Sequence, residues 1–296
     1  MEKGHLFVAI RGLRADGHQF IDKAIQKGAK VLVVEDWPTV SVPDAVVVLQ
    51  VADSRKALGV LAAHFYQHPS HQLKLVGVTG TNGKTSVATL LYRLFVELGF
   101  KAGLISTVEN RVGNKVEPAL FTTPDPVAIN RLLGAMVEQG CDYVFMEVSS
   151  HALDQKRVWG VKFSGGIFTN ISHDHLDYHR TFRAYIEAKK KLFDWLPAEA
   201  FALVNADDKR SEVMVQNSAA GVYRFSLRTA ADFKGKVVES TLEGMEMRIN
   251  EQPFSSRLIG AFNAYNLLAV YGTALLLEQD PTEVLVALSA IPAPEG

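Results

Sequence analysis

A glycine-rich stretch at residues 75–86, LVGVTGTNGKTS, combines residue types that can bind phosphate. Its apolar β-branched start predicts a buried strand, Gly80–Gly83 a tight loop, and the residues from Lys84 onward a helix. Backbone N–H groups at such a helix N-terminus attract phosphate, Lys84 can reach the β- and γ-phosphates, and the Thr85 hydroxyl can hold Mg²⁺. Because Val78 stands where the strict pattern has glycine, we interpret the stretch as a variant nucleotide-phosphate loop.

Two further polar clusters follow predicted strands or turns. Glu147 ends an apolar strand and is followed by Ser149 and Ser150. A carboxylate in that position, in a chain with a phosphate loop, is a natural Mg²⁺ ligand, and the serines offer further oxygens. A helix cap or a salt-bridged carboxylate is the alternative for Glu147. The turn at 122–125 leads into a predicted helix, where it can cap the helix or bind an anion.

Residues 173–179 hold three histidines and two aspartates at another predicted strand end. The segment lacks cysteine and the ligand spacing of zinc sites, so we expect a functional residue here rather than a zinc centre. A structural histidine is the alternative for any single member. Further on, Lys189 lies beside Lys190 and Lys191 on a predicted amphipathic helix. We interpret Lys190 and Lys191 as a solvated face, whereas one inward lysine can serve chemistry because a buried lysine readily shifts its pKa.

The elements that position these residues alternate between strand and helix from residue 73 onward. Strands are predicted at 74–79, 102–106, 143–148, 165–170 and 202–205, and helices at 85–98, 126–139, 182–195 and 211–216. This α/β alternation predicts a P-loop-type, mostly parallel sheet with helices on both faces and ligands beyond the carboxyl ends of its strands. An antiparallel patch at 237–259 and helices at 264–277 and 281–290 complete the prediction.

A small N-terminal α/β unit precedes this sheet. Strands are predicted at 6–10, 31–35 and 45–49, and helices at 17–26 and 54–66, the second capped by Asp53 or Ser54. The polar segment 68–72 is expected to be a linker. We therefore predict two domains, at residues 1–67 and 73–296.

The composition of the 296-residue chain restricts the class of protein. A net charge of -1 argues against a nucleic-acid partner, and no apolar segment is long enough for a membrane span of ~20 residues. The single cysteine, Cys141, cannot form an internal disulfide, which fits a reducing compartment. We expect a cytoplasmic protein without a signal peptide, and a monomer.

Together the clusters resemble the Mur ligases, ATP-dependent enzymes of peptidoglycan synthesis. The resemblance is strongest to the type that adds the third residue of the stem peptide to a UDP-N-acetylmuramoyl-dipeptide. It covers nearly the whole chain and is carried by GTNGKT at 80–85, TTPD at 122–125, EVSSHAL at 147–153, DHLDYH at 174–179, AK at 188–189 with LF at 192–193, and GAFN at 260–263 with Asn266. The segment DGH at 16–18, with FI at 20–21, is similar to the first domain of that family.

The resemblance implies three sets of site residues. ATP would be bound by Gly80, Thr81, Asn82, Gly83, Lys84, Thr85 and Ser86, with Asn263 and Asn266 near the nucleotide. Mg²⁺ would be held by Thr85, Glu147, His175 and Lys189, the last as a carbamylated lysine, and Lys84, His175 and Lys189 would be catalytic. The UDP-muramoyl-peptide would be held by Leu13, Arg14, Ala15, Thr122, Thr123, Ser149, Gln155 and Arg157.

The reaction implied is acyl activation. A substrate carboxylate attacks the γ-phosphate of ATP to give an acyl phosphate and ADP, and the amine of lysine or diaminopimelate then displaces phosphate. The chain ends before the third domain of the family, so the resemblance implies weak nucleotide binding and slow turnover by this chain alone. Two alternatives stay open: a non-catalytic module that binds a nucleotide or UDP-sugar, and a related ligase such as folylpolyglutamate synthetase.

Overall fold

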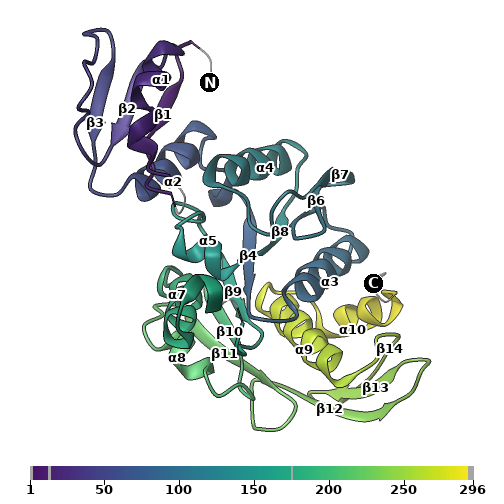
Figure 1. Ribbon diagram of the computed structural model, residues 1–296. Helices are drawn as coiled ribbons and strands as arrows, with labels where there is room; N and C mark the ends of the chain where they lie inside the picture. The colour runs from purple at the N-terminus through teal and green to yellow at the C-terminus, as the bar shows by residue number, and fades with distance from the viewer. Residues whose placement is uncertain (1–2, 13–14, 175, 293–296) are drawn as a thin grey trace.

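The computed structural model describes residues 3–12, 15–174 and 176–292, and its strands form two sheets (Figure 1). The smaller sheet is parallel, in the order β1 (Leu6–Val8), β2 (Val31–Val34) and β3 (Val47–Gln50). A 3-10 turn, η1 (Gly17–Phe20), leads into α1 (Ile21–Gln26), whose apolar residues pack against β2. The small N-terminal α/β unit expected from the sequence is therefore present.

Helix α2 (Ser54–Phe65) connects the small sheet to the rest of the chain and packs beside α4 (Pro126–Glu138). The Asp53 side chain caps α2 by accepting the N–H of Lys56 at 3.0 Å, as its position predicts. The segment expected to be a polar linker forms a 3-10 turn, η2 (Pro69–His71), in which Pro69 and Ser70 are buried. It is buried because it packs against α4.

The larger sheet has eleven strands and a parallel centre. The parallel strands, in spatial order, are β11 (Gly221–Ser226), β10 (Phe201–Asn205), β9 (Gly165–Phe168), β4 (Lys74–Thr79), β8 (Tyr143–Glu147) and β5 (Ala102–Ile105). At one edge β5 continues into the antiparallel strands β6 (Glu109–Val112) and β7 (Lys115–Pro118). At the other edge, β12 (Phe233–Ser240) pairs parallel with β11 and antiparallel with β13 (Met245–Ile249), which pairs antiparallel with β14 (Gln252–Ser256).

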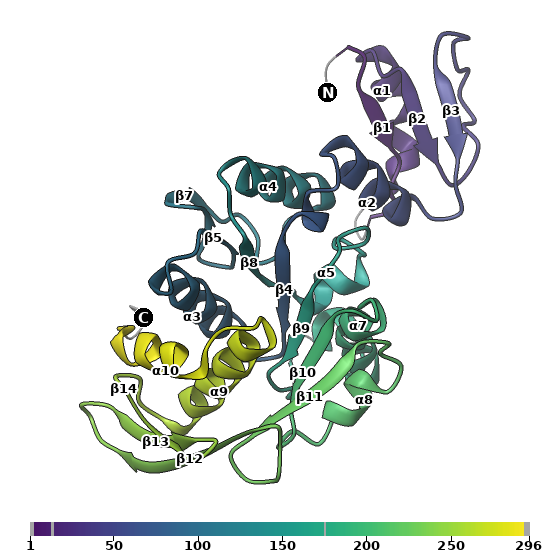
Figure 2. The same ribbon diagram turned by 180° about the vertical axis from the view of Figure 1, so that it is seen from behind.

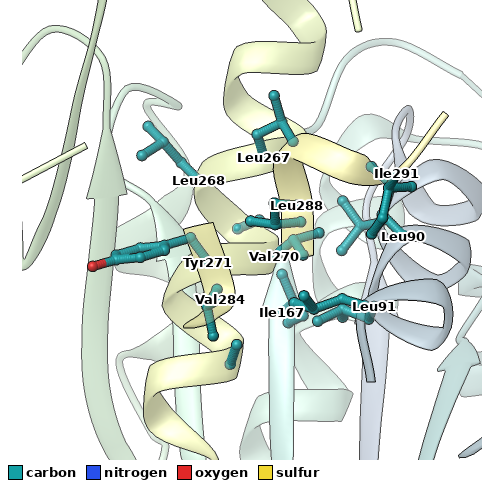
Figure 3. Packing of buried hydrophobic residues seen from close by; sticks show 14 of the residues in the cluster. Leu90, Leu91, Ile167, Leu267, Leu268, Val270, Tyr271, Val284, Leu288 and Ile291 are labelled. Carbon is teal, nitrogen blue, oxygen red and sulfur yellow. The ribbon is translucent and has the colours of Figure 1, made fainter. Parts of the chain in front are cut away.

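Helices cover both faces of this sheet, because successive side chains of a strand point to opposite faces. Val76 and Val78 of β4 lie in a core formed with α3 (Lys84–Glu97), α9 (Ala261–Leu276) and α10 (Pro281–Ala290). Leu75 lies in the opposite core, formed with α4, α7 (Phe182–Asp194) and α8 (Ser211–Val215). Figure 2 shows the same layers from behind, and Figure 3 shows Leu91 of α3 near Ile167 of β9 in the first core.

The predicted strands and helices between residues 73 and 216 are all present, with ends that differ by a few residues. Strands β6, β7 and β11 and the short helices α5 (Ser150–Asp154) and α6 (Leu176–His179) were not predicted. They are four to six residues long and too short or too polar to show a clear period. Of the helices that the structure describes, none has the length and apolar character needed to cross a membrane.

Candidate active site

The predicted phosphate loop lies between the end of β4 at Thr79 and the start of α3 at Lys84. Gly83 precedes α3 in the left-handed conformation, with φ +85°, and a Cβ there would lie 2.7 Å from Asn266 Oδ1. A Cβ on Gly80 would lie 1.9 Å from the Thr169 hydroxyl oxygen. The loop therefore needs glycine at both positions, and the first-turn N–H groups of α3 are left for an anion.

The residues after β9 hold the loop in place, a role that the sequence did not indicate. Thr81 N–H donates to the Asn170 carbonyl at 2.8 Å, and Asn82 N–H donates to Asn170 Oδ1 at 3.0 Å. The Thr169 hydroxyl donates to the Asn82 carbonyl at 2.7 Å. Their position at the carboxyl end of the predicted strand 165–170 was the signal available for finding Thr169 and Asn170.

Two lysine amines converge on the same loop. Lys84 Nζ donates to the carbonyls of Gly80 and Thr81 at 3.0 and 2.8 Å, and Lys189 Nζ, from α7, donates to the Gly80 carbonyl at 2.7 Å. Lys189 is 1% exposed. Burial lowers the pKa of both amines, and the nearby Lys84 charge lowers the pKa of Lys189 further, while Asp174 acts in the opposite direction.

The neighbours of Lys189 differ from each other. Lys191 donates to Asp154 at 2.8 Å and is partly exposed, in line with the predicted surface face. The prediction is wrong for Lys190, which is 7% exposed and pairs with Asp194 one turn further along α7. Its Asp194 partner lets an amine sit at a buried position of the helix.

Glu147 is fully buried at the end of β8 and accepts hydrogen bonds from two threonines. Its Oε2 accepts from the Thr85 hydroxyl at 3.0 Å and from the Thr107 hydroxyl at 3.2 Å, and its Oε1 accepts from Thr107 N–H at 2.7 Å. Carboxylate and hydroxyl oxygens are the donors that Mg²⁺ takes, so Thr85 and Glu147 fit that ion. Thr107 was missed by the sequence analysis, although it directly follows a predicted strand.

The histidine-rich segment does not assemble a metal site in the part that the structure describes. His175, expected as a metal ligand and catalytic residue, lies outside the described residues. His173 stacks on Phe182 with ring centroids 4.3 Å apart, and His179 Nε2 lies 3.0 Å from the Ser150 hydroxyl. Among described residues, no three His, Cys, Asp or Glu side chains are grouped as metal ligands.

The turn at residues 122–125 contacts the end of β8 beside Glu147. The Thr123 hydroxyl donates to the Glu147 carbonyl at 2.9 Å and accepts Ser149 N–H at 3.0 Å. Thr122 Oγ1 accepts from the Thr107 hydroxyl at 3.1 Å, and Arg157 donates to the Thr123 carbonyl at 2.9 Å. These contacts bring together residues 15 to 34 positions apart, which the sequence alone could not place against one another.

Arg157 and Gln155 form a second pair near this turn. The guanidinium donates to Gln155 Oε1 through Nε at 3.1 Å and Nη2 at 2.8 Å, and Gln155 Nε2 donates to the Tyr178 hydroxyl at 3.1 Å. Burial lowers the pKa of Arg157, but a guanidinium stays charged at neutral pH. Arg157 therefore offers a fixed positive charge.

Three cavities run through the site. The cavity of about 390 Å³ is lined by Lys84, Thr85, Thr107, Phe121, Thr122, Thr123, Glu147, Ser149, Ser150, His151, Arg157 and Lys189. A neighbouring cavity of about 300 Å³ shares Phe121 and Arg157 with it and reaches Ile10 and Arg55. A third, of about 740 Å³, lies on the other side of the loop and includes Asn82, Gly83 and Ser86.

The largest cavity also contains residues that the sequence analysis did not select. Asn266 lines it, and Asn263 Oδ1 accepts from Asn266 Nδ2 at 3.1 Å. Asp207 and Tyr265 line it too, and the Tyr265 hydroxyl donates to Asp207 at 2.9 Å. Burial and this hydrogen bond raise the pKa of Tyr265 to about 12. The sequence around Asp207, after β10, and around Tyr265, beside Asn266, contains no motif that would have distinguished these two residues.

Of the three residues of the N-terminal unit that were expected to bind the UDP-muramoyl-peptide, the structure describes one, Ala15. Leu13 and Arg14 lie outside the described residues. Ala15 is exposed, and its carbonyl accepts Gly12 N–H at 2.9 Å in the turn closed by the Arg11–Asp16 bridge. From the other side, Arg55 donates to the Arg11 carbonyl at 2.7 Å, which links this turn to α2 and the smallest cavity.

Sequence comparison finds relatives along the whole chain. It is 55% identical over 296 residues to the "UDP-N-acetylmuramoyl-L-alanyl-D-glutamate--2,6-diaminopimelate ligase" of Cytophaga hutchinsonii, covering 100% of this chain and 61% of the relative. The equally named protein of Bacteroides fragilis is 52% identical over 291 residues, which are 98% of this chain and 60% of the relative. The chain thus spans about three fifths of the length of these relatives.

Structure comparison gives the same fold. A solved "UDP-N-acetylmuramoyl-L-alanyl-D-glutamate--2, 6-diaminopimelate ligase" matches with a TM-score of 0.86 at 26% identity, covering 100% of this chain and 62% of that one. The MurF ligase of Thermotoga maritima, solved in complex with ADP, matches with a TM-score of 0.62 at 18% identity over 99% of this chain and 64% of that one, a likeness of fold alone.

Family comparison assigns both parts of the chain. Residues 1–66 match "Mur ligase family, catalytic domain", and residues 78–274, about two thirds of the chain, match "Mur ligase middle domain". The second match contains the phosphate loop, Glu147, Lys189 and both asparagines of α9. This protein therefore belongs to the Mur ligase family.

Proposed function

We propose that this chain carries the ATP- and UDP-sugar-binding parts of a ligase that joins 2,6-diaminopimelate to UDP-MurNAc-L-Ala-D-Glu. The observation that carries the proposal is the cavity of about 390 Å³, where Lys84, Glu147 and Lys189 face the Thr122–Thr123 turn. It borders the nucleotide-type loop at Lys84 and Thr85, and it shares Phe121 and Arg157 with the cavity of about 300 Å³. The relatives' names favour diaminopimelate over lysine as the incoming amino acid.

ATP would lie across the phosphate loop. The cavity of about 740 Å³ beside Asn82 and Gly83 has room for the base and ribose, and the N-terminus of α3 faces the phosphates. Thr85 and Glu147 would hold Mg²⁺, which neutralises phosphate charge when bound. Lys84, which now donates to two loop carbonyls, can turn to the β- and γ-phosphates when these arrive.

Catalysis would rest on positioning and on charge neutralisation. The glutamyl carboxylate oxygen attacks the γ-phosphorus, the bond from that phosphorus to the β-phosphate oxygen breaks, and an acyl phosphate and ADP form. The neutral amine of diaminopimelate then attacks the acyl carbon, loses a proton and displaces inorganic phosphate. Arg157, Thr122 and Ser149 would orient the substrate, and Lys84 would stabilise charge on the transferred phosphoryl group.

Lys189 fits the carbamylated lysine that the family resemblance implies. Carbon dioxide adds to a neutral amine, and burial together with Lys84 favours the neutral form of Lys189. The side chain also lines the cavity between Lys84 and Glu147, where a carbamate would add an anionic oxygen ligand. His175 would be a further ligand.

The two parts of the chain would divide the substrates. Residues 1–67 would hold the uridine end through the turn at Leu13, Arg14 and Ala15, and residues 73–296 would bind ATP and the muramoyl-peptide. We place the reaction in the cytoplasm, in a monomer, in keeping with the single cysteine.

An assay of ADP release tests the proposal. It is run with UDP-MurNAc-L-Ala-D-Glu and either diaminopimelate or lysine, on the 296-residue chain and on this chain joined to the C-terminal domain of the Cytophaga relative. We expect release that requires both substrates, prefers diaminopimelate and rises on joining. No release by either protein, together with no effect of Lys189→Ala, would leave the binding-module interpretation. Release with folylglutamate instead would favour the related synthetase.

A further inference from the structure

Two adjacent residues at the start of α2 are tied to different parts of the molecule. Ser54 donates through both its N–H and its hydroxyl to Glu35 Oε1, each at 2.8 Å, just after β2 of the small sheet. Asp53 pairs through Oδ2 with Lys156 Nζ, in the loop that follows α5. The first turn of α2 therefore joins the small sheet to the unit that contains the larger one.

Lys156 occupies an unusual backbone conformation for its residue type. Its φ is +55°, a left-handed value that glycine or asparagine adopts more easily than a residue with a longer side chain. Its amine and the Asp53 carboxylate are both about three quarters buried, with side chains 28% and 26% exposed. The ion pair gives a physical reason for a long cationic side chain at this turn.

The neighbours of both residues line the same cavity, the one of about 300 Å³. Arg55 and Leu58 line it from α2, and Gln155 and Arg157 line it from the loop that contains Lys156. Each partner of the ion pair is thus within two residues of an arginine that lines the cavity.

The contact between α2 and the loop after α5, to which the Asp53–Lys156 pair belongs, continues along α2. A Cβ on Gly59 would lie 2.2 Å from the Trp159 carbonyl oxygen, and Lys56 Nζ lies 4.3 Å from the centre of the Trp159 ring. Helix α2 therefore rests directly on the backbone of residues 156–160. Apart from these packing contacts, the Asp53–Lys156 pair is the charged link across the contact in the part of the chain that the structure describes.

We propose that Asp53 and Lys156 are positioning residues for the UDP-sugar end of the substrate. By holding α2 against the loop after α5, they fix the spacing of Arg55 and Arg157 across the cavity. This inference rests on the proposed function, because it takes that cavity as the place of the UDP-linked substrate. Neither Asp53 nor Lys156 touches the phosphate loop, so the binding of ATP or ADP should be independent of the pair.

A double-mutant cycle on the 296-residue chain tests the inference. Asp53→Asn removes the charge but keeps an oxygen to cap α2, and Lys156→Asn removes the amine but tolerates the left-handed backbone. Lys162→Asn is the matched control, because it breaks the 3.0 Å Lys162–Glu199 pair, which does not border this cavity. Calorimetry gives the Kd for UDP-MurNAc-L-Ala-D-Glu and for ADP.

We expect each single variant to raise the Kd for the UDP-linked ligand about three- to tenfold. The double variant should raise this Kd no more than the single variant with the larger effect, because the two groups act as a unit. The Kd for ADP, and both values in the control, should stay unchanged. Additive losses, equal losses for both ligands, or no loss for the UDP-linked ligand overturn the inference.

Amide hydrogen exchange without ligand keeps the two proposals distinguishable. The first turns of α2 should exchange faster in both single variants than in the parent, and as in the parent in the control. If the parent does not bind the UDP-linked ligand at all, the proposed function fails. Equal exchange of α2 in parent and variants overturns the positioning role whatever the ligand result.

Discussion

Lys84 and Lys189 donate to one and the same acceptor, the Gly80 carbonyl, at 3.0 and 2.7 Å. The two amines come from α3 and α7, on opposite faces of the sheet, and meet at the carboxyl end of β4. Two cations so close to each other are unfavourable, and Lys189 is the more deeply buried. Lys189 is therefore the amine that gives up its proton more easily. The neutral amine that results is the form that reacts with carbon dioxide.

Lys189→Met should separate the chemical and structural effects of this amine. Turnover should fall at least about 100-fold, since an oxygen ligand can no longer form. The folded pKa of Lys189 is below its ordinary 10.5, so the unfolded chain binds the extra proton. Relative to the variant, the unfolding free energy of the parent should therefore rise as the pH increases toward the ordinary lysine pKa of 10.5. Urea unfolding across that range checks this, and identical pH slopes would contradict it.

Gly83→Ala should disrupt nucleotide binding. The new Cβ would lie 2.7 Å from Asn266 Oδ1, so the loop or α9 has to move, and we expect ADP binding at least about tenfold weaker. Gly99→Ala is the control, because Gly99 has a similar φ of +89° but open space around its Cβ. Both should lose about 1 kcal/mol of stability from the left-handed backbone. Equal ADP affinity in the two variants would show that the close approach at Gly83 is unimportant.

The sequence predicted the strand, the glycine turn and the helix around residues 80–85 well, because the requirements of these elements are local. The glycines at 80 and 83 and the hydroxyl at 85 follow from the geometry of one strand, one turn and one helix. The same holds for the caps of α2 and α4, where Asp53 and Asp125 accept backbone N–H groups. Lys190 shows the limit, because its burial depends on how α7 packs and not on the sequence near it.

Glu147→Gln should abolish the effect of Mg²⁺ while preserving the fold. The amide oxygen can still accept Thr107 N–H, so the free energy of unfolding should change by less than about 1 kcal/mol. The lost charge removes a hard oxygen ligand next to Thr85. Titration of ADP with and without Mg²⁺ should show a dependence in the parent that the variant lacks. A variant that keeps the same Mg²⁺ dependence would exclude Glu147 as a ligand.

Asp207→Asn should destabilise the wall of the largest cavity in a pH-dependent way. Burial raises the pKa of Asp207, but donors on Ser226, Leu227 and Tyr265 outweigh it and hold the pKa below 3.8. The carboxylate therefore stabilises the fold above its ordinary pKa, and this contribution is lost as pH falls through the lower folded value. We expect a loss of about 1–3 kcal/mol at neutral pH.

Chemical unfolding of parent and variant from neutral pH down to about pH 3 follows this difference. The gap between the two proteins should be constant above about pH 5 and should narrow below about pH 4. A gap that widens with acid would mean that the Asp207 carboxylate is not held in its charged form.

The walls of the cavities could not be predicted in the same way as the loop. Thr107 meets Glu147 because β5 and β8 are adjacent in the sheet, and Tyr265 meets Asp207 because helix α9 packs against β10. The Asp53–Lys156 pair joins residues 103 positions apart. Such contacts depend on strand order and helix packing, which hydrophobic periodicity does not specify.

The most direct measurement of the central claim is oxygen transfer from substrate to phosphate. UDP-MurNAc-L-Ala-D-Glu labelled with ¹⁸O in the glutamyl side-chain carboxylate is incubated with the protein, ATP and diaminopimelate, at enzyme in excess so that slow turnover suffices. Lys189→Met serves as the background. An acyl phosphate predicts inorganic phosphate carrying one ¹⁸O from the carboxylate in the parent. Phosphate without label, formed at the rate of the background, would contradict the account.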